Sequence, residues 1–570
     1  MGGVFMKKIK KLLGTLLGIA LTFGTMGGYV NAAPTENETK TTSQIYAEAM
    51  APGWNLGNTF DGFDTGGDKG EESWGNPKVT KELIHTIKEQ GFKSIRMPFT
   101  TEMRIGEAPE YKIDEAFLNR YAEVVDWALE EDLYIMINVH HDSWIWAYNI
   151  GGDDQAPMEK YIAIWKQLAE RFKNYPEKVC FESLNEPFFN GEEAQQIEIN
   201  NKVNETFYDL IRKSGGKNAT RMLVLPTLNT NDSQARCDAL YNSIKALNDS
   251  NIIATFHYYG YWPFSVNIAG TTTFDETTRV ELENAFNRVY DTFVKKGIGV
   301  ICGEYGLLGF DTSLDAIEHG EMLKYFEYIS YYAKTKDITL MLWDNGQHMG
   351  RTTYKWSDPE LYEMIKADGK KRSSYTETDR VFVNKADKNE DVKLKLTLNG
   401  NKLTSITDEK GILQLGKEYT CTDELLTLKG SYIDQVVGKD FGQSMSLKLK
   451  YSEGADWTIY INHYKLLELS SATGTIEGLS IPAKFNGTRI STMEAFYKDG
   501  SIAGPQNWTS FKEFAYTFAP DYKNNQIIIK DKFFAECNDG EVLLKFYLQS
   551  GEIVEYSLTK TGTKVVGKAL

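Results

Sequence analysis

Eight short apolar segments recur between about residues 50 and 345, separated by amphipathic stretches. They read APGWNLGN, SIRMPF, YIMINVHH, VCFESLNEP, MLVLPTLN, IIATFHYYGYW, GVICGEYG and ITLMLWDNG. Between them lie helical patterns such as YIAIWKQLAERFKNY, with apolar residues at i, i+3, i+4 and i+7. Eight strand and helix units in roughly 300 residues predict a (β/α)8 TIM barrel of the α/β class. An open doubly wound sheet is the alternative, but no GxGxxG or GxxxxGK[ST] loop favours it.

The length of the chain bears on the number of domains, and its net charge limits the kinds of partner. A chain of 570 residues exceeds one ordinary core, which predicts more than one domain. The net charge of −16 disfavours nucleic acid, anionic membranes and acidic polysaccharides, because each would be repelled. We therefore expect a neutral partner and a monomeric protein.

The N-terminus has the pattern of a secretory signal peptide over residues 1–32. The basic KKIKK precedes the apolar LLGTLLGIALTFGTMGG, and small residues follow at Val30 and Ala32. A membrane anchor is the alternative, but this run is shorter than the ~20 residues that span a bilayer. We expect cleavage, no later membrane contact, and secretion to the extracellular space.

Three domains are predicted after the signal. The barrel covers residues 40–372 and ends near the polar KKRSSYTETD. An immunoglobulin-like β-sandwich covers 376–467, where KLKLTLNGNKLTSI carries an Asn-Gly hairpin signal and the SMSLKLKY and WTIYINHY segments alternate. A second β-rich block covers 468–570. The fold class is thus a barrel followed by two small all-β domains.

Nearly every barrel segment ends in polar or aromatic residues. The carboxyl ends of parallel strands meet at one face of a barrel, so these side chains should share a pocket. They are Asn55, Arg96, His140, His141, Asn185, Glu186, His257, Tyr259, Glu304 and Trp343.

The stretch FESLNEP holds two glutamates that are not partners. Pro187 predicts extended backbone at Glu186, which would place Glu182 and Glu186 roughly 13 Å apart along a strand. A retaining glycosidase needs two carboxyls about 5–5.5 Å apart, one protonated and one ionised. Glu304 therefore becomes the partner of Glu186, while Glu182 should fill the barrel interior against a partner such as an arginine. A structural salt bridge at the strand ends is the alternative for Glu186 and Glu304.

Other residues suit supporting roles in such a site. Asn185 can hold a sugar hydroxyl, and Arg96 and Tyr259 can donate to an ionised carboxylate. His140 and His141 could suggest a metal site. Neighbouring residues on a strand point to opposite faces, however, so both could bind one ion only if the strand has ended. The loop DGFDTGGDKGEE lacks the spacing of a calcium loop, so no metal is expected. Trp343 could stack on a sugar ring, as could the loop tryptophans Trp74, Trp144, Trp146 and Trp262.

Cysteine spacing adds no further site. The five cysteines form no CxxC pair and no zinc-like spacing. A tertiary disulfide among them stays open.

Seven motifs in order resemble glycoside hydrolase family 5, subfamily 4, over about residues 40–370. They are GWNLGNTFD, RMPF, INVHH, FESLNEP, HYYGYW, GEYG and LMLWDNG. The resemblance implies that Glu186 is the acid/base and Glu304 the nucleophile. It implies that the sugar contacts are Arg96, His140, Asn185, His257, Tyr259 and Trp343, with Asn55 and His141 as further ones.

The C-terminal blocks resemble the immunoglobulin-like domain and family 46 carbohydrate-binding module of secreted bacterial cellulases. Trp508 of PQNWTSF is then the expected sugar-stacking residue of the module. The resemblance implies an endo-β-1,4-glucanase without cofactors, acting on cellulose, mixed-linkage glucan or xyloglucan, or less readily on mannan. A binding protein with an inactive barrel is the rival reading, and intact Glu186 and Glu304 argue against it.

Overall fold

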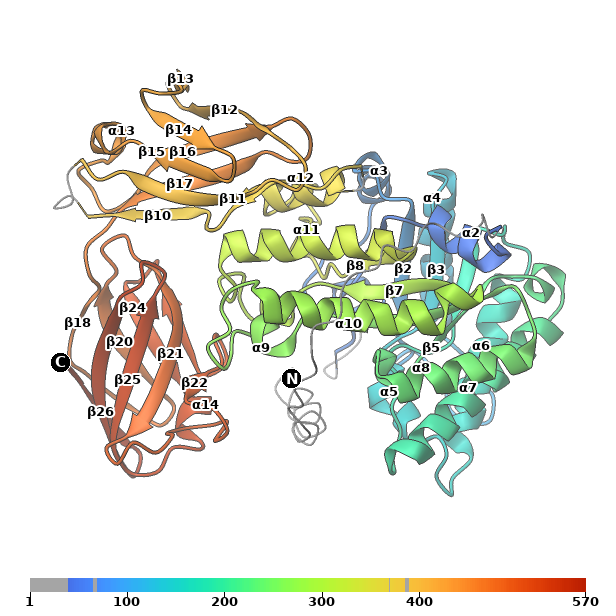
Figure 1. Cartoon of the computed structure of the whole chain (residues 1–570). Coiled ribbons are helices and arrows are strands. Elements are labelled where there is room, and N and C mark those ends of the chain that lie inside the picture. Colours follow the sequence, from blue (N-terminus) through green and yellow to red (C-terminus); the bar gives the residue numbers. More distant parts are fainter. Residues whose placement is uncertain (1–38, 65–68, 369, 385–388) are drawn as a thin grey trace, which may run out of the picture. The chain divides into compact units, whose positions relative to one another are not determined.

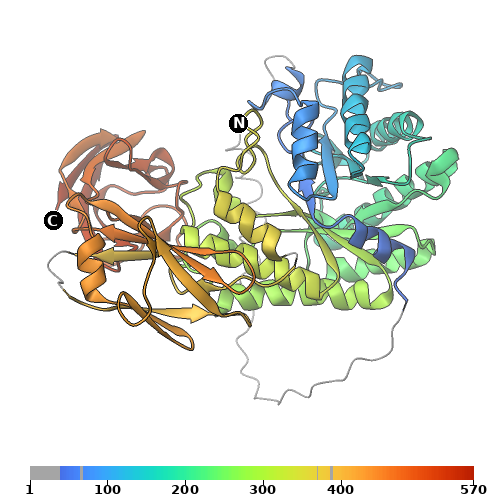
Figure 2. The same ribbon diagram turned by 90° about the horizontal axis from the view of Figure 1, so that it is seen from above.

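The computed structural model describes residues 39–64, 69–368, 370–384 and 389–570; the predicted signal peptide lies outside the described residues. Eight parallel strands close into a barrel, and helices surround them (Figures 1 and 2). This confirms the predicted fold class. The strands are β1 (Gly53–Asn55), β2 (Ser94–Phe99), β3 (Tyr134–Val139), β4 (Val179–Glu182), β5 (Leu223–Pro226), β6 (Ile252–Tyr258), β7 (Gly299–Tyr305) and β8 (Ile338–Leu342).

The outer helices bury one apolar stripe each against these strands. In α6 (Ala156–Arg171) the buried side chains include Tyr161, Ile164, Trp165 and Leu168, which is the predicted i, i+3, i+4, i+7 pattern. The other long helices are α3 (Lys81–Glu89), α4 (Glu115–Glu130), α7 (Glu193–Lys213), α8 (Gln234–Leu247), α10 (Glu276–Thr292), α11 (His319–Thr335) and α12 (Pro359–Asp368).

A short helix, α2 (Thr42–Ala49), closes the amino-terminal end of the barrel. Its Ala47 and the following Met50 pack with interior residues such as Met136 and Met341. Apolar filling at this end leaves the opposite end, where the strands reach their carboxyl termini, for polar chemistry. In the described part of the chain, no helix combines the length and the apolar character needed to cross a bilayer.

Two all-β domains follow the barrel. The first packs the sheet β10-β17-β16-β12-β13 against the sheet β14-β15-β11-β9. Its strands are β9 (Tyr375–Thr376), β10 (Arg380–Val383), β11 (Val392–Thr397), β12 (Leu403–Asp408), β13 (Gly411–Ile412), β14 (Tyr419–Thr422), β15 (Leu425–Leu428), β16 (Gly442–Tyr451) and β17 (Trp457–His463), with α13 (Gly430–Val436).

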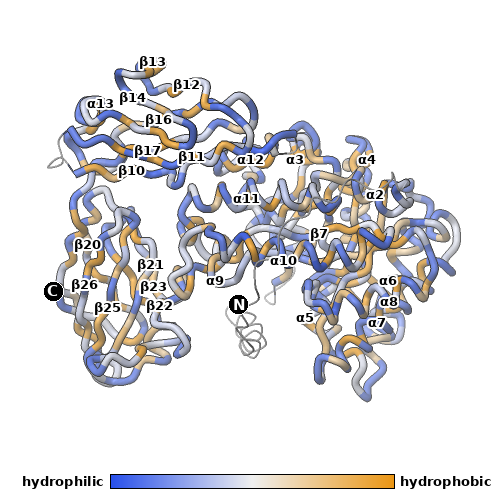
Figure 3. The backbone as a smooth tube through the Cα atoms, in the orientation of Figure 1, coloured by the Kyte–Doolittle hydropathy of each residue, from blue (hydrophilic) through white to orange (hydrophobic). Residues whose placement is uncertain are grey.

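The second all-β domain is built on one large sheet. Its strand β25 (Gly540–Leu548) alternates buried and more exposed residues from Val542 on. Figure 3 shows hydrophobic and hydrophilic residues mixed along the strands of this domain. The other elements are β18 (Glu468–Leu469), β19 (Ala472–Thr475), β20 (Gly478–Lys484), β21 (Ile490–Tyr497), β22 (Phe511–Lys512), β23 (Phe518–Asp521), β24 (Gln526–Lys530), α14 (Asp531–Phe534), β26 (Ile553–Thr561) and β27 (Lys564–Ala569).

The hairpin predicted at Asn399-Gly400 is wrong. The strands on either side of it, β11 and β12, lie in different sheets, where β11 pairs with β15 and β12 with β16. The buried Asn401 donates from its amide to Arg372 O and Ser374 Oγ, which ties this connection to the start of the domain. Strand β11 buries Leu394 and Leu396, and β12 buries Ile406, so the two strands contribute to the core from different sheets. The alternating segments in β16 and β17 do pair as neighbours.

His319 joins the barrel to the first all-β domain. It begins α11, and its ring nitrogens lie 2.9 Å from Asp379 Oδ2 and 3.0 Å from Asp358 Oδ2. Burial alone would lower the pKa of His319, but the two carboxylates outweigh it and raise this pKa from 6.5 to about 10. The histidine is therefore a cation at neutral pH, held between two anions.

His319→Gln should destabilise the protein by about 2 kcal/mol at pH 6, the scale of hydrogen bonds between charged groups. Because the folded-state pKa is raised, this stabilisation is fully present below pH 6.5 and is lost as pH rises through about 10. Denaturation of wild type and variant from pH 6 to 10.5 should show the gap narrowing. His85→Gln, at an exposed pair with Glu131, should cost under about 1 kcal/mol; a gap that is constant with pH would contradict the charged pairing.

Candidate active site

Arg96 occupies the centre of the barrel mouth. It lies on β2 with an exposed fraction of 0%. Its Nε and Nη2 donate to Glu182 at 2.7 and 3.2 Å, and its Nη1 donates to Glu304 Oε1 at 2.6 Å. Burial alone would lower the pKa of Arg96, but these two carboxylates raise it above its ordinary value. Glu182 thus has the arginine partner that the sequence predicted, and this partner also holds Glu304.

Two asparagines are oriented by the same guanidinium. Arg96 Nη2 donates to Asn185 Oδ1 at 2.8 Å, which leaves the Asn185 NH2 group for another acceptor. Arg96 Nη1 donates to Asn55 Oδ1, and Asn55 Nδ2 donates to Gly303 O at 2.9 Å. Asn55 is fully buried with both ends of its amide bonded inside the barrel. This geometry favours a supporting role over the sugar contact that the resemblance implied.

Glu304 is buried among donors. Besides Arg96, the Tyr259 hydroxyl donates to Glu304 Oε2 at 2.5 Å. A bulge in the pairing of β6 with β7 sets His257 opposite Glu304. A side chain on Gly303 would be crowded there, because a Cβ would lie 3.0 Å from Thr255 Oγ1 and 3.1 Å from His257 Nε2. Both oxygens of Glu304 thus accept hydrogen bonds from side chains of other elements, which fixes the carboxylate in position.

Glu186 has a more open environment. Its side chain is 34% exposed, and its Oε1 accepts from His257 Nδ1 at 3.0 Å. The extended backbone predicted before Pro187 is wrong, because β4 ends at Glu182 and Glu186 has a φ of +38°. This uncommon conformation costs about 1–3 kcal/mol and is typical of functional positions. One oxygen each of Glu186 and Glu304 and a nitrogen of His257 lie within 4.8 Å of one another.

His140 and Trp343 form a stacked pair beside these carboxylates. Their rings are 5.6 Å apart and nearly parallel. Burial, with His141, Arg96 and His257 nearby, lowers the pKa of His140 well below 6.5, so the ring is neutral. Asn138 Nδ2 lies 3.0 Å from His140 Nδ1 and donates to it, which leaves the proton on Nε2. That nitrogen is 3.9 Å from Glu304 Oε1.

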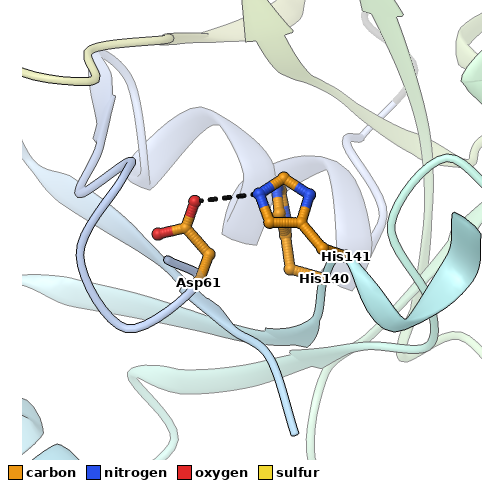
Figure 4. A group of neighbouring side chains, drawn as sticks. All are labelled: Asp61, His140 and His141. Carbon is orange, nitrogen blue, oxygen red and sulfur yellow. Dashed lines mark ion pairs between the residues drawn. The ribbon is translucent and has the colours of Figure 1, made fainter. Parts of the chain in front are cut away.

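His141 lies beside His140, as Figure 4 shows with Asp61. Because β3 ends at Val139, the two rings need not point to opposite faces, and their centroids are 4.4 Å apart. His141 Nδ1 accepts from the Trp144 indole at 2.9 Å, and Nε2 lies 3.2 Å from Asp61 Oδ2. Asp61 in turn accepts from the backbone of Asn58 and Thr59. Both nitrogens of His141 thus face protein groups, those of Trp144 and Asp61.

Aromatic side chains gather at two places around the mouth. Near His141, the rings of Phe63, Trp74 and Trp144 lie within 6 Å of a neighbour, and Trp74 is 37% exposed. Trp146 instead donates to Asp142 and packs under Lys160. Beyond β6, Trp262 lies 6.0 Å from Trp508 of the last domain, and Trp508 is 51% exposed.

Sequence reasoning missed three supporting residues: Asn138, Asp61 and Phe63. Asn138 could have been found, because it lies two positions before His140 in INVHH and so shares its side of the strand. Asp61 and Phe63 are in a loop whose approach to His141 has no signature in the local pattern.

A buried, donor-bound carboxylate opposite a more exposed one at the mouth of a (β/α)8 barrel is an arrangement that fits a glycoside hydrolase. The cellulase family, glycosyl hydrolase family 5, matches residues 55–349, carbohydrate binding domain X2 matches 375–461, and the family 46 carbohydrate binding domain matches 466–568. The chain belongs to glycosyl hydrolase family 5. The predicted resemblance is confirmed, with the domain expected to be immunoglobulin-like matching the X2 family.

Relatives share this order of domains over nearly the whole chain. Endoglucanase B of Paenibacillus lautus is 49% identical over 532 residues, covering 92% of this chain and 93% of the relative. A trimodular endoglucanase of subfamily GH5_4 superposes with a TM-score of 0.91 at 45% identity, covering 93% and 100%. The trimodular endo-β-1,4-glucanase B of Bacillus halodurans gives 0.90 at 46% identity, covering 93% and 99%.

Glu182→Ala should destabilise the barrel by about 1.5–3 kcal/mol, because it leaves the buried Nε of Arg96 without its acceptor while Glu304 still balances the charge. Urea unfolding followed by tryptophan fluorescence would measure this. Glu123→Ala is the matched control, since Glu123 also pairs with an arginine, Arg120, but is 53% exposed. Its expected cost is under about 1 kcal/mol; equal costs would contradict a structural need for Glu182.

Proposed function

We propose that this enzyme is a secreted endo-β-1,4-glucanase that cleaves internal bonds of β-glucans with retention of configuration. The observation that carries the proposal is the pair Glu186 and Glu304, whose nearest oxygens lie within 4.8 Å. This spacing suits a double displacement, whereas an inverting enzyme needs carboxyls about 6.5–9.5 Å apart to admit water. The names of the relatives and the predicted signal peptide support the substrate class and the export.

In the first step Glu304 attacks the anomeric carbon. A bond forms between its carboxylate oxygen and the sugar while the glycosidic bond breaks, and Glu186 gives its proton to the leaving oxygen. Arg96 and Tyr259 hold the nucleophile in its ionised form before the attack. In the second step Glu186 takes a proton from water, which attacks the same carbon and releases Glu304.

The sugar being cleaved would lie over Trp343 and His140. We assign hydrogen bonds to the sugar to the Asn185 NH2 group and to His140 Nε2, because neither is fully used by the protein. Asn55 and His141 support these contacts from within the protein. Asn55 acts through Arg96, and His141 acts through the loop that contains Asp61. No cofactor takes part in these steps. Cellulose, mixed-linkage glucan and xyloglucan are the proposed substrates.

Azide distinguishes the two carboxylates. In Glu304→Ala the rate on an activated aryl β-glucoside should fall by about three orders of magnitude or more. Added azide should then attack from the vacated side and give an α-glycosyl azide. In Glu186→Ala azide should meet the glycosyl-enzyme and give the β-glycosyl azide, both read by NMR. The opposite pattern would reverse the assignment, and a Glu304→Ala enzyme as active as wild type would eliminate the catalytic reading.

Trp508 should contribute to polymer binding, because it is exposed beside Trp262 at the barrel mouth. Trp508→Ala should raise KM for xyloglucan and barley-type β-glucan about two- to tenfold, from a stacking contribution of about 0.5–1.5 kcal/mol. Phe441→Ala is the control, since Phe441 is 49% exposed on the X2 domain. An equal effect of both variants would show that any exposed aromatic ring suffices.

A further inference from the structure

Lys512 is a buried lysine in the last domain. Its exposed fraction is 0%, and it lies on β22 opposite Met493. Its Nζ donates to Pro505 O at 2.7 Å and to Thr509 O at 3.2 Å. Burial lowers the pKa of Lys512 to about 8, against smaller opposing effects of Cys537 and Glu536. Burying an ammonium group without an ion pair is unfavourable, so its two carbonyl partners call for an explanation.

Those two carbonyls begin and end the segment Pro505–Thr509, which carries Trp508. Thr509 N donates to Gln506 O at 3.1 Å, and Gln506 has a φ of +56°, so the segment is a tight turn. One ammonium group bonded to both ends fixes the direction of this turn. Apart from the backbone bond, Gln506 has only a long contact from Nε2 to Glu513 Oε2, at 3.4 Å. Thr509 Oγ1 also accepts from Phe511 N at 3.2 Å, but among the described contacts Lys512 is the side chain that bonds to both ends of the turn beneath Trp508.

The direction of Trp508 matters because of what lies across from it. Its ring is 6.0 Å from that of Trp262, at an angle of 39°. Trp262 follows Tyr259 by three residues, and the Tyr259 hydroxyl donates to the nucleophile Glu304. A glucan chain that leaves the carboxylates past β6 would therefore meet both rings. A turn held in place before the chain arrives also reduces the entropy lost on binding.

We propose that Lys512 is a positioning residue for polymer binding, which holds the Pro505–Thr509 turn so that Trp508 faces the glucan chain beside Trp262. This rests on the polymer-binding role proposed above for Trp508. Lys512 itself touches neither the sugar nor the carboxylates, so its effect should reach substrate only through Trp508.

The test compares a polymer with a short substrate. Lys512→Met keeps the length of the side chain and removes its donors. The ratio of kcat/KM on soluble β-glucan to kcat/KM on an aryl cellotrioside should fall about three- to tenfold, through KM for the polymer rather than kcat. Lys530→Met is the matched control, because Lys530 on β24 also donates to a carbonyl, that of Ala515, away from this turn. Its ratio should equal that of wild type.

A double variant shows whether the effect passes through Trp508. Lys512→Met combined with Trp508→Ala should give the same ratio as Trp508→Ala alone. A further fall in the double variant, an unchanged ratio in Lys512→Met, or an equal fall in Lys530→Met would each overturn the proposal. If Lys512→Met shows no cooperative thermal transition, Lys512→Gln, whose shorter side chain spans only one carbonyl, should show the same fall.

The outcomes also separate this proposal from the one it rests on. If Trp508→Ala leaves the ratio unchanged, Trp508 has no role in polymer binding and both proposals fail together. If Trp508→Ala lowers the ratio and Lys512→Met does not, the role of Trp508 stands and only the positioning role of Lys512 is overturned.

Discussion

The guanidinium of Arg96 is the interaction on which the rest of the site depends. It is fully buried and shared between Glu182, which is also fully buried, and Glu304. Its fixed fork of donors bonds to both carboxylates and sets their positions as well as those of Asn55 and Asn185. One residue of β2 thereby ties together β1, β4 and β7 at the mouth. Glu304 is held in place by the same contacts that stabilise the barrel.

The two carboxylates differ because their surroundings differ. Glu304 lies among fixed donors, whereas Glu186 stands on a turn after β4 with His257 beside it and a third of its side chain exposed. In the proposed mechanism the acid/base must exchange protons with substrate and water, which the partial exposure of Glu186 would permit. The nucleophile must be held in position, which the hydrogen bonds from Arg96 and Tyr259 to Glu304 would provide. The bulge at Gly303 allows His257 to contact Glu186 without displacing Glu304.

Much of the fold and the site could be predicted from the sequence, because both follow from local periodicity. Strands that end in polar residues must bring those residues together once the barrel closes, so pairing Glu186 with Glu304 needed no coordinates. Two predictions that rested on a single local signal were wrong. The Asn-Gly turn did not join neighbouring strands, because alternation shows which face is buried but not which sheet a strand enters. Pro187 did not extend Glu186, because the strand had already ended at Glu182.

By itself, then, the sequence determined the barrel and the polar strand ends that converge at its mouth. The tertiary structure alone decided which donors surround each group: Arg96 between two carboxylates, Asp61 beside His141, and Lys512 beneath the turn of Trp508. The physical reason is that periodicity assigns a side chain to a face of its own element. Its partner is fixed only when the chain folds, whether that partner lies on a distant element, as for Arg96 and Glu304, or in a neighbouring turn, as for Lys512.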